Sequence, residues 1–530
     1  MEIARLIKGL SDPRAYPHAV DRVQECQTHI SVVFLAGPFA YKVKKPVKFD
    51  FVDFSTPARR QFYCEEEVRL NRRLADPIYH GVVPITQAGQ DIRMEGEGET
   101  IESAVKMERL PAENTLASLV AGNLASPDHI NLLAERVAAF HDRANTGSEI
   151  AAFGRYEVVA GNAQENFEQA EKQVGDGLSA AVFKRLRLLT ESKLNRLRPL
   201  IEQRAQSGVP CDTHGDLRLE HVYFFPDRPP PNDLIIIDCV EFNERFRFAD
   251  PVNDMAFLVM DLIAHGRRDL AEVFAETYFR ASGDAEGRAL LPFYTSYRAA
   301  VRAKVAGIKA KEPEVPEADR ALALAKARAR WLLALAELEE PGCKPCLLLV
   351  GGLPGTGKST LARGLAEQAN AQIIRSDVVR KELAGITGQS ARSVEFEGGV
   401  YSADWTKRTY CECLRRAESL LFEGNRVIVD ATFGKEFWRH AFFDLAKRYG
   451  LPALIFICKA APESVRMRLS TRKNDVSDAD WNVHLQTAAR WEETGEYTRA
   501  ALREIPSDGD PQVTLAAALD ELRSRGLQAP

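Results

Sequence analysis

The 530-residue chain lacks a run of about 18 uncharged apolar residues, which a helix needs in order to cross a bilayer. Its first residues include Glu2 and no long apolar core, so they do not resemble a secretory signal peptide. The nine cysteines are an odd number scattered along a long chain, which is typical of reduced thiols rather than of a disulfide framework. We therefore expect a cytoplasmic protein with no membrane partner.

The chain also lacks a large excess of charge of either sign. Its 70 lysines and arginines against 75 aspartates and glutamates leave a formal net charge of −5, so no global basic field calls for a nucleic-acid partner. A local groove could still bind one. With 34 glycines and 27 prolines the chain has too few of either for a low-complexity or fibrous protein.

Prolines on both sides of one helical segment indicate a domain boundary. Residues 317–340 are rich in Ala, Leu and Arg, carry apolar residues at helical spacing and are flanked by prolines on both sides. We therefore predict a first domain over residues 1–316, a helical connector over 317–342 and a second domain over 343–530.

The two domains differ in the order of their predicted elements. In the second, apolar runs such as CLLLVGG, RVIVDAT and ALIFICKA each precede a helical pattern, which predicts a parallel sheet covered on both faces. In the first, strands over 30–37, 40–47 and 103–110 come early, and helices follow. This order predicts an α+β protein with two lobes.

The segment GLPGTGKST follows the first apolar run of the second domain and matches the P-loop pattern. Its glycines let backbone N–H groups face phosphate oxygens, and the helix that begins there adds positive potential. Lys358 supplies a cation to the β- and γ-phosphates, and Ser359 offers a hydroxyl to Mg²⁺. The predicted MgATP site comprises Gly352, Gly355, Thr356, Gly357, Lys358, Ser359 and Thr360.

Three further features of this domain suit phosphoryl transfer. Asp430 ends a predicted buried strand, where a carboxylate could hold the Mg²⁺ water shell or merely cap the strand end. Asp377 ends another strand and could accept a proton from an attacking hydroxyl, or cap the next helix. Arg466, Arg468 and Arg472 could close over the phosphates, or form a solvated helix face.

Together with the glycine-rich loop, the segments RSDVVRK, VIVDATF and RLSTRKNDVSDAD resemble P-loop kinases of the polynucleotide-kinase and zeta-toxin type, over about residues 345–500. The resemblance implies that Asp377 is the catalytic base, Arg380 a substrate or phosphate contact and Arg472 a lid arginine at the nucleotide. A P-loop also fits an ATPase that only hydrolyses. Because Asp430 is followed by Ala431 rather than by a catalytic glutamate, the sequence favours a kinase.

The first domain also has a group of acidic residues on adjacent predicted loops. Asp216 lies in THGDLRLEH, Asp238 ends the apolar run IIID, and ADPVND follows. One acid could accept a hydroxyl proton, and the other could bind Mg²⁺ that bridges ATP phosphates. Upstream, Lys42 could pair with the phosphates and be oriented by a helix acid, Glu66 or Glu67, although Lys44 faces the same way on the strand.

The ordered segments AYKVKK, CEEEVRL, VKMERLP, HGDLRLEH, IIDCVEF and DPVNDMA resemble the aminoglycoside phosphotransferase family over about residues 25–300. The resemblance implies a protein-kinase-like fold in which Asp216 is the catalytic base, Asp238 is the metal ligand, and His214 and Asp254 brace the loop. It also implies that residues 107–110 present backbone groups to adenine.

Two positions depart from that family. Arg218 stands where the family usually has His, and His221 stands where it usually has a second Mg²⁺-binding Asn. A neutral imidazole is a poor ligand for Mg²⁺, which prefers oxygen. Two alternatives therefore stay open for the first domain, namely a small-molecule kinase and a pseudokinase that captures substrate for the second domain or regulates it.

We therefore expect a bifunctional ATP- and Mg²⁺-dependent phosphotransferase of two domains. The N-terminal one has an α+β bilobal protein-kinase-like fold, and the C-terminal one is an α/β P-loop NTPase with a parallel sheet. The acceptor is a small-molecule or polynucleotide hydroxyl. A nucleotide-sensing regulator and a nucleic-acid end kinase are the alternatives, and the charge balance gives the second of these no support.

Overall fold

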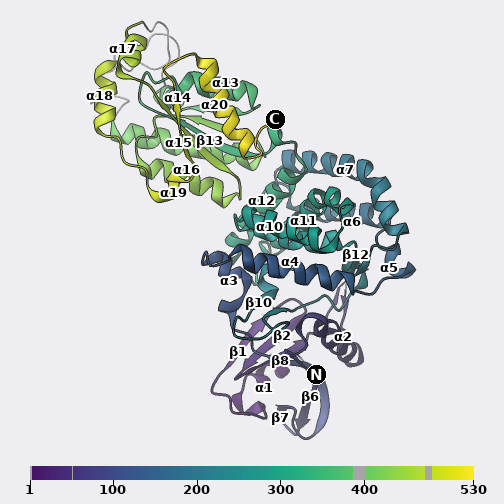
Figure 1. Ribbon diagram of the computed structural model, residues 1–530. Coiled ribbons are helices and arrows are strands. Elements are labelled where there is room, and N and C mark those ends of the chain that lie inside the picture. The colour runs from purple at the N-terminus through teal and green to yellow at the C-terminus, as the bar shows by residue number, and fades with distance from the viewer. Residues whose placement is uncertain (1–2, 50–51, 386–401, 472–479, 530) are drawn as a thin grey trace. The chain divides into compact units, whose positions relative to one another are not determined.

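The computed structural model describes residues 3–49, 52–385, 402–471 and 480–529 (Figure 1). Contacts within the chain form two compact units, one of Met1–Gly161 with Leu197–Tyr294 and the other of Asn162–Arg196 with Thr295–Pro530. The domain limits predicted at 316 and 342 stay a prediction. Helix α12 (Glu317–Leu338) lies where the sequence predicted the connecting helix.

An antiparallel sheet of six strands, in the order β1-β2-β3-β8-β6-β7, opens the first unit. The strands are β1 (Val23–Gln27), β2 (Ser31–Ala36), β3 (Phe39–Lys44), β6 (Tyr79–Ala88), β7 (Asp91–Met94) and β8 (Glu99–Glu108). The strands predicted over 30–37 and 40–47 are confirmed as β2 and β3, which pair as a hairpin, and the strand predicted over 103–110 is confirmed as β8.

Helices lie on both faces of this sheet. On one face α1 (Ile3–Leu10) packs Leu10 into a cluster that includes Tyr41, and on the other α2 (Pro57–Ala75) packs Val68 against Ala40. Successive strand residues point to opposite faces. Lys42, two residues after Ala40, is therefore directed toward α2.

The rest of the first unit is mainly helical and carries its acidic loops beside two short antiparallel sheets. One sheet pairs β9 (Cys211–Asp212) with β12 (Phe248–Ala249), and the other pairs β10 (Val222–Phe224) with β11 (Leu234–Ile236). The helices are α3 (Leu116–Ala121), α4 (Pro127–Asp142), α5 (Ser148–Ala152), α8 (Glu244–Arg247), α9 (Pro251–Ala264) and α10 (Arg268–Ser282). A sheet lobe followed by a helical lobe confirms the predicted kinase-like fold.

A parallel sheet of five strands, in the order β14-β15-β13-β16-β17, forms the core of the second unit. The strands are β13 (Cys346–Gly351), β14 (Gln372–Arg375), β15 (Arg426–Asp430), β16 (Ala453–Lys459) and β17 (Leu502–Pro506). Every residue of β13 and of β15 is buried, as a sheet covered on both faces requires. The predicted α/β P-loop fold is confirmed.

Helices cover this sheet on both faces (Figure 1). On one, α13 (Lys358–Gln368) and α20 (Pro511–Ser524) pack Leu361 and Leu515 into one cluster with β13. The others near the sheet are α14 (Ser376–Leu383), α15 (Ala403–Phe422), α16 (Glu436–Arg448), α17 (Pro462–Thr471), α18 (Trp481–Ala489) and α19 (Glu496–Arg499).

The remaining α-helices of the described residues are α6 (Tyr156–Ala170), α7 (Ala180–Gln206) and α11 (Leu291–Lys309). Within the second unit, Arg185 on α7 pairs with Glu339 after α12 and donates to the carbonyl oxygens of Cys343 and Gly424. In the described ranges, none of the helices combines the length and the apolar character that crossing a membrane requires.

Candidate active sites

The glycine-rich loop connects β13 to α13 in a conformation that requires glycine. Gly352 and Gly355 have φ values of 141° and 83°. A Cβ atom on Gly352 would lie 2.7 Å from Oγ1 of Thr356, and one on Gly355 would lie 2.8 Å from Cγ1 of Val465. The loop therefore closes on itself as a backbone cradle, which is the arrangement that binds phosphate groups.

Distant residues hold the carbonyl groups of this loop. Ser507 donates its hydroxyl to the carbonyl of Thr356 at 2.7 Å, and His484 donates Nδ1–H to the carbonyl of Pro354 at 2.8 Å. Neither contact could be predicted from the sequence, because Ser507 follows β17 and His484 lies on α18, both far from the loop along the chain. These bonds hold the loop through its carbonyl groups and do not use its backbone N–H groups, the donors that phosphate oxygens would need.

The predicted P-loop residues differ in exposure. Thr356 is buried and donates its hydroxyl to the carbonyl of Leu353 at 2.8 Å, which gives it a role in the shape of the loop. Lys358 and Ser359 open α13 and are half-buried, whereas Thr360 is exposed. Nucleotide contacts by these residues stay a prediction.

Asp430 lies at the carboxyl end of β15, level with Val350 on β13 and Arg375 on β14. Its side chain is buried, and Oδ2 lies 3.4 Å from Nε of Arg375. Its Oδ1 is a buried oxygen without a hydrogen-bond partner among the described residues. A carboxylate oxygen left over beside a phosphate cradle fits a Mg²⁺ ion and its water shell.

Arg468 is the arginine of the predicted lid that the structure brings to the loop. Its Nη1 lies 3.7 Å from the position a Cβ on Gly357 would take, and this nitrogen is buried without a partner among the described residues. Nη2 donates to the carbonyls of Ser507 at 2.5 Å and Asp508 at 3.2 Å. An anchored guanidinium with an unused donor over the loop fits a phosphate oxygen.

The other two lid arginines differ from this one. Arg466 stacks on Trp481, with its guanidinium carbon 4.4 Å from the ring centroid, and Trp481 in turn stacks on His484 at 4.8 Å. Arg472, which the resemblance implies at the nucleotide, lies outside the described residues. Its role stays a prediction.

Asp377 occupies the first turn of α14, next to the sheet edge that carries Asp430. The helix has Arg375 at its N-cap position, so Asp377 is inside the helix rather than at the cap. Its side chain is half-buried. One turn later Arg380 is buried and donates Nη1–H to Oγ1 of Thr406 at 3.4 Å. The fold thus brings Asp377 to the edge of the sheet where the glycine-rich loop lies.

In the first unit, one glutamate binds both lysines of β3. Glu67 on α2 lies 2.9 Å from Nζ of Lys42 and 2.7 Å from Nζ of Lys44. Glu66 instead pairs with Arg69 on the same helix. Lys44 is buried and also pairs with Glu241, whereas Lys42 reaches Asp238 at 2.7 Å. Lys42 is thus the lysine directed to the acidic loops, and Glu67 is the acid that orients it.

Charge pairing dominates the ionisation of this cluster. Burial opposes the charge of Lys42, but Asp238 and Glu67 together raise its pKa well above the usual value. Burial likewise opposes ionisation of Asp238, yet the ammonium group of Lys42 lowers the pKa of this carboxyl well below its usual range. Lys42 and Asp238 are therefore both ionised at neutral pH.

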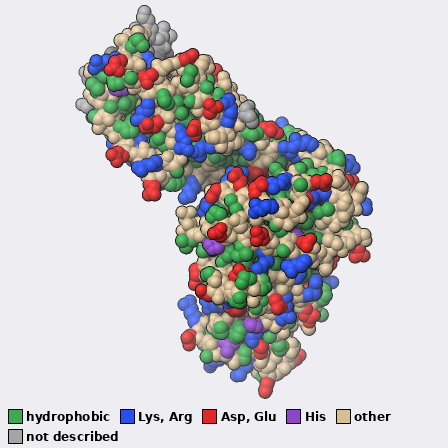
Figure 2. Space-filling view, viewed as in Figure 1, with side chains coloured by type: hydrophobic (Ala, Val, Ile, Leu, Met, Phe, Trp, Pro, Cys, Tyr) green, Lys and Arg blue, Asp and Glu red, His purple; other side chains and the backbone are tan. Residues whose placement is uncertain are grey.

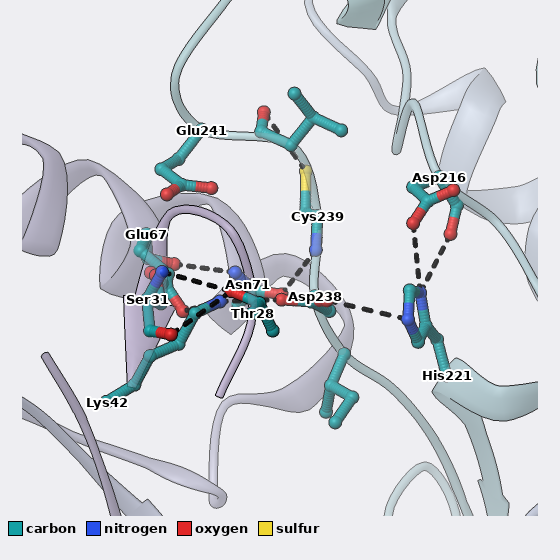
Figure 3. A network of polar contacts seen from close by, with 12 residues as sticks. Thr28, Ser31, Lys42, Glu67, Asn71, Asp216, His221, Asp238, Cys239 and Glu241 are labelled. Atoms are coloured by element: carbon teal, nitrogen blue, oxygen red, sulfur yellow. Dashed lines mark hydrogen bonds and ion pairs between the residues drawn. The ribbon is translucent and has the colours of Figure 1, made fainter. Parts of the chain in front are cut away.

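The two acids predicted for catalysis and metal binding lie on either side of one imidazole ring (Figure 3). Nδ1 of His221 donates to the carbonyl oxygen of Asp216 at 2.9 Å, and Nε2 lies 3.4 Å from Oδ2 of Asp238. Asp238 has a φ of 66°, a left-handed conformation that is costly for this residue and is concentrated at functional sites. The structure thus brings Asp216, Asp238 and Lys42 together at one site.

Arg218, the other departure from the family pattern, contacts the same groups. Its Nε donates to Oδ2 of Asp216 at 3.1 Å, and its Nη2 donates to Nε2 of His221 at 2.8 Å. In the described part of the chain, no three His, Cys, Asp or Glu side chains converge closely enough to ligate one ion. Because Asp238 already pairs with Lys42 and Asp216 with Arg218, the side chains around Asp238 do not fit the Mg²⁺ site that the resemblance implies, and that role stays a prediction.

Asp254 holds the loop that carries Asp216. This buried carboxylate accepts the backbone N–H groups of His214 at 3.0 Å and Gly215 at 2.8 Å, and it also contacts Nε2 of His141 at 3.1 Å. His214 donates Nε2–H to the carbonyl of Ile237 at 3.0 Å, while its Nδ1 receives the N–H of Asp216 at 3.4 Å. A neutral ring satisfies both contacts, so His214 links the two acidic loops.

Glu67→Gln provides a test of this cluster. We expect it to lower the free energy of opening of β3 and α2 by about 3–5 kcal/mol, because one partner is removed from a buried ion pair. Native-state hydrogen exchange of the amides in these elements measures the change. Glu66→Gln is the matched control, and since an exposed pair contributes little, its effect should stay below about 1 kcal/mol. Equal effects would contradict the assignment of Glu67.

His214 predicts a pH dependence of stability. Burial lowers its pKa from 6.5 to about 4, so the ring stays neutral in the folded chain while it takes up a proton in the unfolded chain. The lowered pKa of His214 therefore adds to the free energy of unfolding. This contribution is fully present above pH 6.5 and is lost as the pH falls toward 4. Between these values the slope of unfolding free energy against pH should be less steep in His214→Gln by about 1.4 kcal/mol per pH unit. Urea unfolding of both chains at several pH values measures the slopes, and identical slopes would refute the prediction.

Comparison with known proteins finds a family match within the second unit. Residues 347–494 match a family model described as an AAA domain. The chain is 34% identical over 467 residues to the uncharacterized protein Rv2004c of Mycobacterium tuberculosis. The alignment covers 88% of this chain and 89% of that protein. The same identity and coverage hold for the uncharacterized protein Mb2027c of Mycobacterium bovis.

Similar solved structures include two nucleotide complexes. The GDP complex of aminoglycoside 2'-phosphotransferase-IIIa is 15% identical, with a TM-score of 0.38, and covers 59% of this chain and 94% of that one. Kti12 of Chaetomium thermophilum with ADP-AlF3 is 20% identical, with a TM-score of 0.26, and covers 34% of this chain and 97% of that one.

Proposed function

The chain belongs to the family of these uncharacterized mycobacterial proteins, and from that premise we propose that it is an ATP-dependent kinase whose second unit transfers the γ-phosphoryl group of ATP to a hydroxyl acceptor. The observation that carries the proposal is the pair of unused polar atoms beside the glycine-rich loop. Oδ1 of Asp430 and Nη1 of Arg468 are both buried, and neither has a partner among the described residues. A carboxylate oxygen that could bind a magnesium ion and a guanidinium N–H that could bind a phosphate oxygen are what a magnesium-bound triphosphate needs beside the loop.

The roles of the residues follow from their positions. The backbone of residues 352–360 and the start of α13 bind the phosphates, and Lys358 and Arg468 balance their charge. Ser359 and Asp430 would hold Mg²⁺, which neutralises charge on the transferred group. Asp377 takes the proton of the acceptor hydroxyl as the acceptor oxygen bonds to the γ-phosphorus and the bond to ADP breaks. Positioning and charge neutralisation provide most of the rate.

Two alternative functions remain open for the first unit. As an active kinase it would use Asp216 as base, and as a pseudokinase it would capture substrate for the second unit or regulate it. The ion pairs of Asp216 with Arg218 and of Asp238 with Lys42 favour the second role, because both acids are already compensated by cations of the protein.

A nucleic-acid end kinase is the weaker alternative for the acceptor. On the face shown in Figure 2, lysines and arginines are interspersed with aspartates and glutamates rather than gathered into a stripe. Binding to a phosphate backbone draws on a continuous basic surface. Together with the formal net charge of −5, this face gives the end kinase no support, and we propose a small-molecule hydroxyl as acceptor.

A screen of metabolites and oligonucleotides with ATP labelled at the γ-phosphate tests the proposed function. We expect transfer of label to a small hydroxyl compound by the full chain. Labelled inorganic phosphate without any labelled acceptor would indicate an ATPase, and binding of ATP without turnover would indicate a nucleotide sensor. Labelled oligonucleotide ends, with a rate that falls steeply with salt, would favour the end kinase.

A further inference from the structure

The first unit carries the side chains of a kinase-like nucleotide site. Its two acidic residues, however, already pair with cations of the protein. Lys42, held by Glu67, lies where a lysine meets nucleotide phosphates in a kinase-like lobe. The carboxylate of Asp238, which would be the main Mg²⁺ ligand, already binds Nζ of Lys42 at 2.7 Å. That of Asp216 already binds Nε of Arg218 at 3.1 Å. Each acid thus has a cation of the protein in place of a metal.

The hydrogen bonds of His221 exclude it as a ligand. Nη2 of Arg218 lies 2.8 Å from Nε2, and since a guanidinium can only donate, Nε2 is the acceptor. Nδ1 then carries the proton that is donated to the carbonyl of Asp216 at 2.9 Å. Both ring nitrogens are occupied, so no lone pair faces an ion. An ion placed between Asp216 and Asp238 would also lie beside a guanidinium, which repels it.

The same contacts leave a donor that an anion could use. Nη2 of Arg218 has a neutral partner, the imidazole of His221, and a phosphate oxygen would replace it with a stronger, charge-assisted bond. Lys42 and Arg218 keep 16% and 15% of their side-chain surfaces exposed, whereas Lys44 keeps 1%. Lys42 and Arg218 are therefore the cations of this cluster that a ligand can reach.

We propose that the first unit binds a nucleoside triphosphate without a divalent cation, with Lys42 and Arg218 meeting its phosphates in place of the metal. This site is separate from the one proposed to transfer phosphate in the second unit, and either can fail without the other. It also accounts for the two departures from the family pattern as one change, because Arg218 and His221 bind each other.

Hydrogen-exchange mass spectrometry of the full chain with ATP tests the proposal, once in MgCl₂ and once in EDTA. We expect peptides from β3 and from residues 107–110 to be protected in both buffers, with ATP midpoints that differ by less than about two-fold. Peptides from residues 352–360 report on the second unit in the same samples. Protection of the first unit that requires Mg²⁺, or none in either buffer, would overturn the proposal.

A double variant, Arg218→His with His221→Asn, tests the residues themselves. It restores the two side chains that the family pattern has at these positions and removes the guanidinium. We expect MgCl₂ to strengthen its binding of ATP in the first unit by about 10-fold or more over EDTA. Exchange of α2 amides without ligand checks that the variant is folded. A folded variant that is as indifferent to Mg²⁺ as the parent chain would refute the role of Arg218 and His221.

Discussion

We expect the Lys358→Ala variant to lose nucleotide binding in the second unit while the first unit keeps its own. Lys358 is the first residue of α13, directly after the loop that closes as a phosphate cradle. Loss of one charge-assisted contact to phosphate costs about 2–3 kcal/mol, or about 30- to 150-fold in affinity. Transfer should fall by a further 10²–10³-fold, roughly, because the same cation stabilises charge in the transition state.

Hydrogen exchange in residues 352–360, titrated with MgATP, measures this affinity apart from that of the first unit. Lys326→Ala is a matched control, because this lysine is exposed on α12 and the change removes the same charge and side chain. The control should bind MgATP as the parent chain does. Unchanged protection of residues 352–360 in Lys358→Ala would contradict the proposed nucleotide site.

The sequence predicted those parts of the fold that have a local signal. The glycine-rich loop, the buried strands before it and around Asp430, and the hairpin of β2 and β3 all show in short stretches of residues. Strand β17 was not predicted, because Ile505 is its one buried residue and no apolar run marks it. Strand β6 was missed because Gly81 and Pro84 interrupt its pattern.

The candidate sites were predictable as residue types but not as contacts. Glu66 and Glu67 are adjacent and chemically alike, and only the rotation of α2 decides that Glu67 faces Lys42. The sequence marked Arg218 and His221 as departures, yet their mutual hydrogen bond depends on how the loop folds. The contacts of Ser507 and His484 with the glycine-rich loop join segments more than 100 residues apart in sequence, which no local pattern encodes.

The second large effect concerns the proposed base. We expect Asp377→Asn to lower the rate of transfer to the acceptor by about 10²–10⁴-fold, the usual contribution of a general base. An amide has nearly the shape of the carboxylate but cannot take the proton of a hydroxyl. Because Asp377 lies on α14 rather than in the glycine-rich loop, affinity for MgATP should change by less than about two-fold.

Single-turnover transfer of labelled phosphate to the acceptor found in the screen measures the rate, and exchange protection of residues 352–360 measures the affinity. Asp444→Asn, an identical change on the exposed face of α16, should leave both unchanged. Full transfer by Asp377→Asn would remove Asp377 as base. Loss of binding together with transfer would instead give it a role in holding the nucleotide. Only a rate that falls while affinity is kept assigns the proton to this side chain, because the two measurements separate a transition-state contact from a ground-state one.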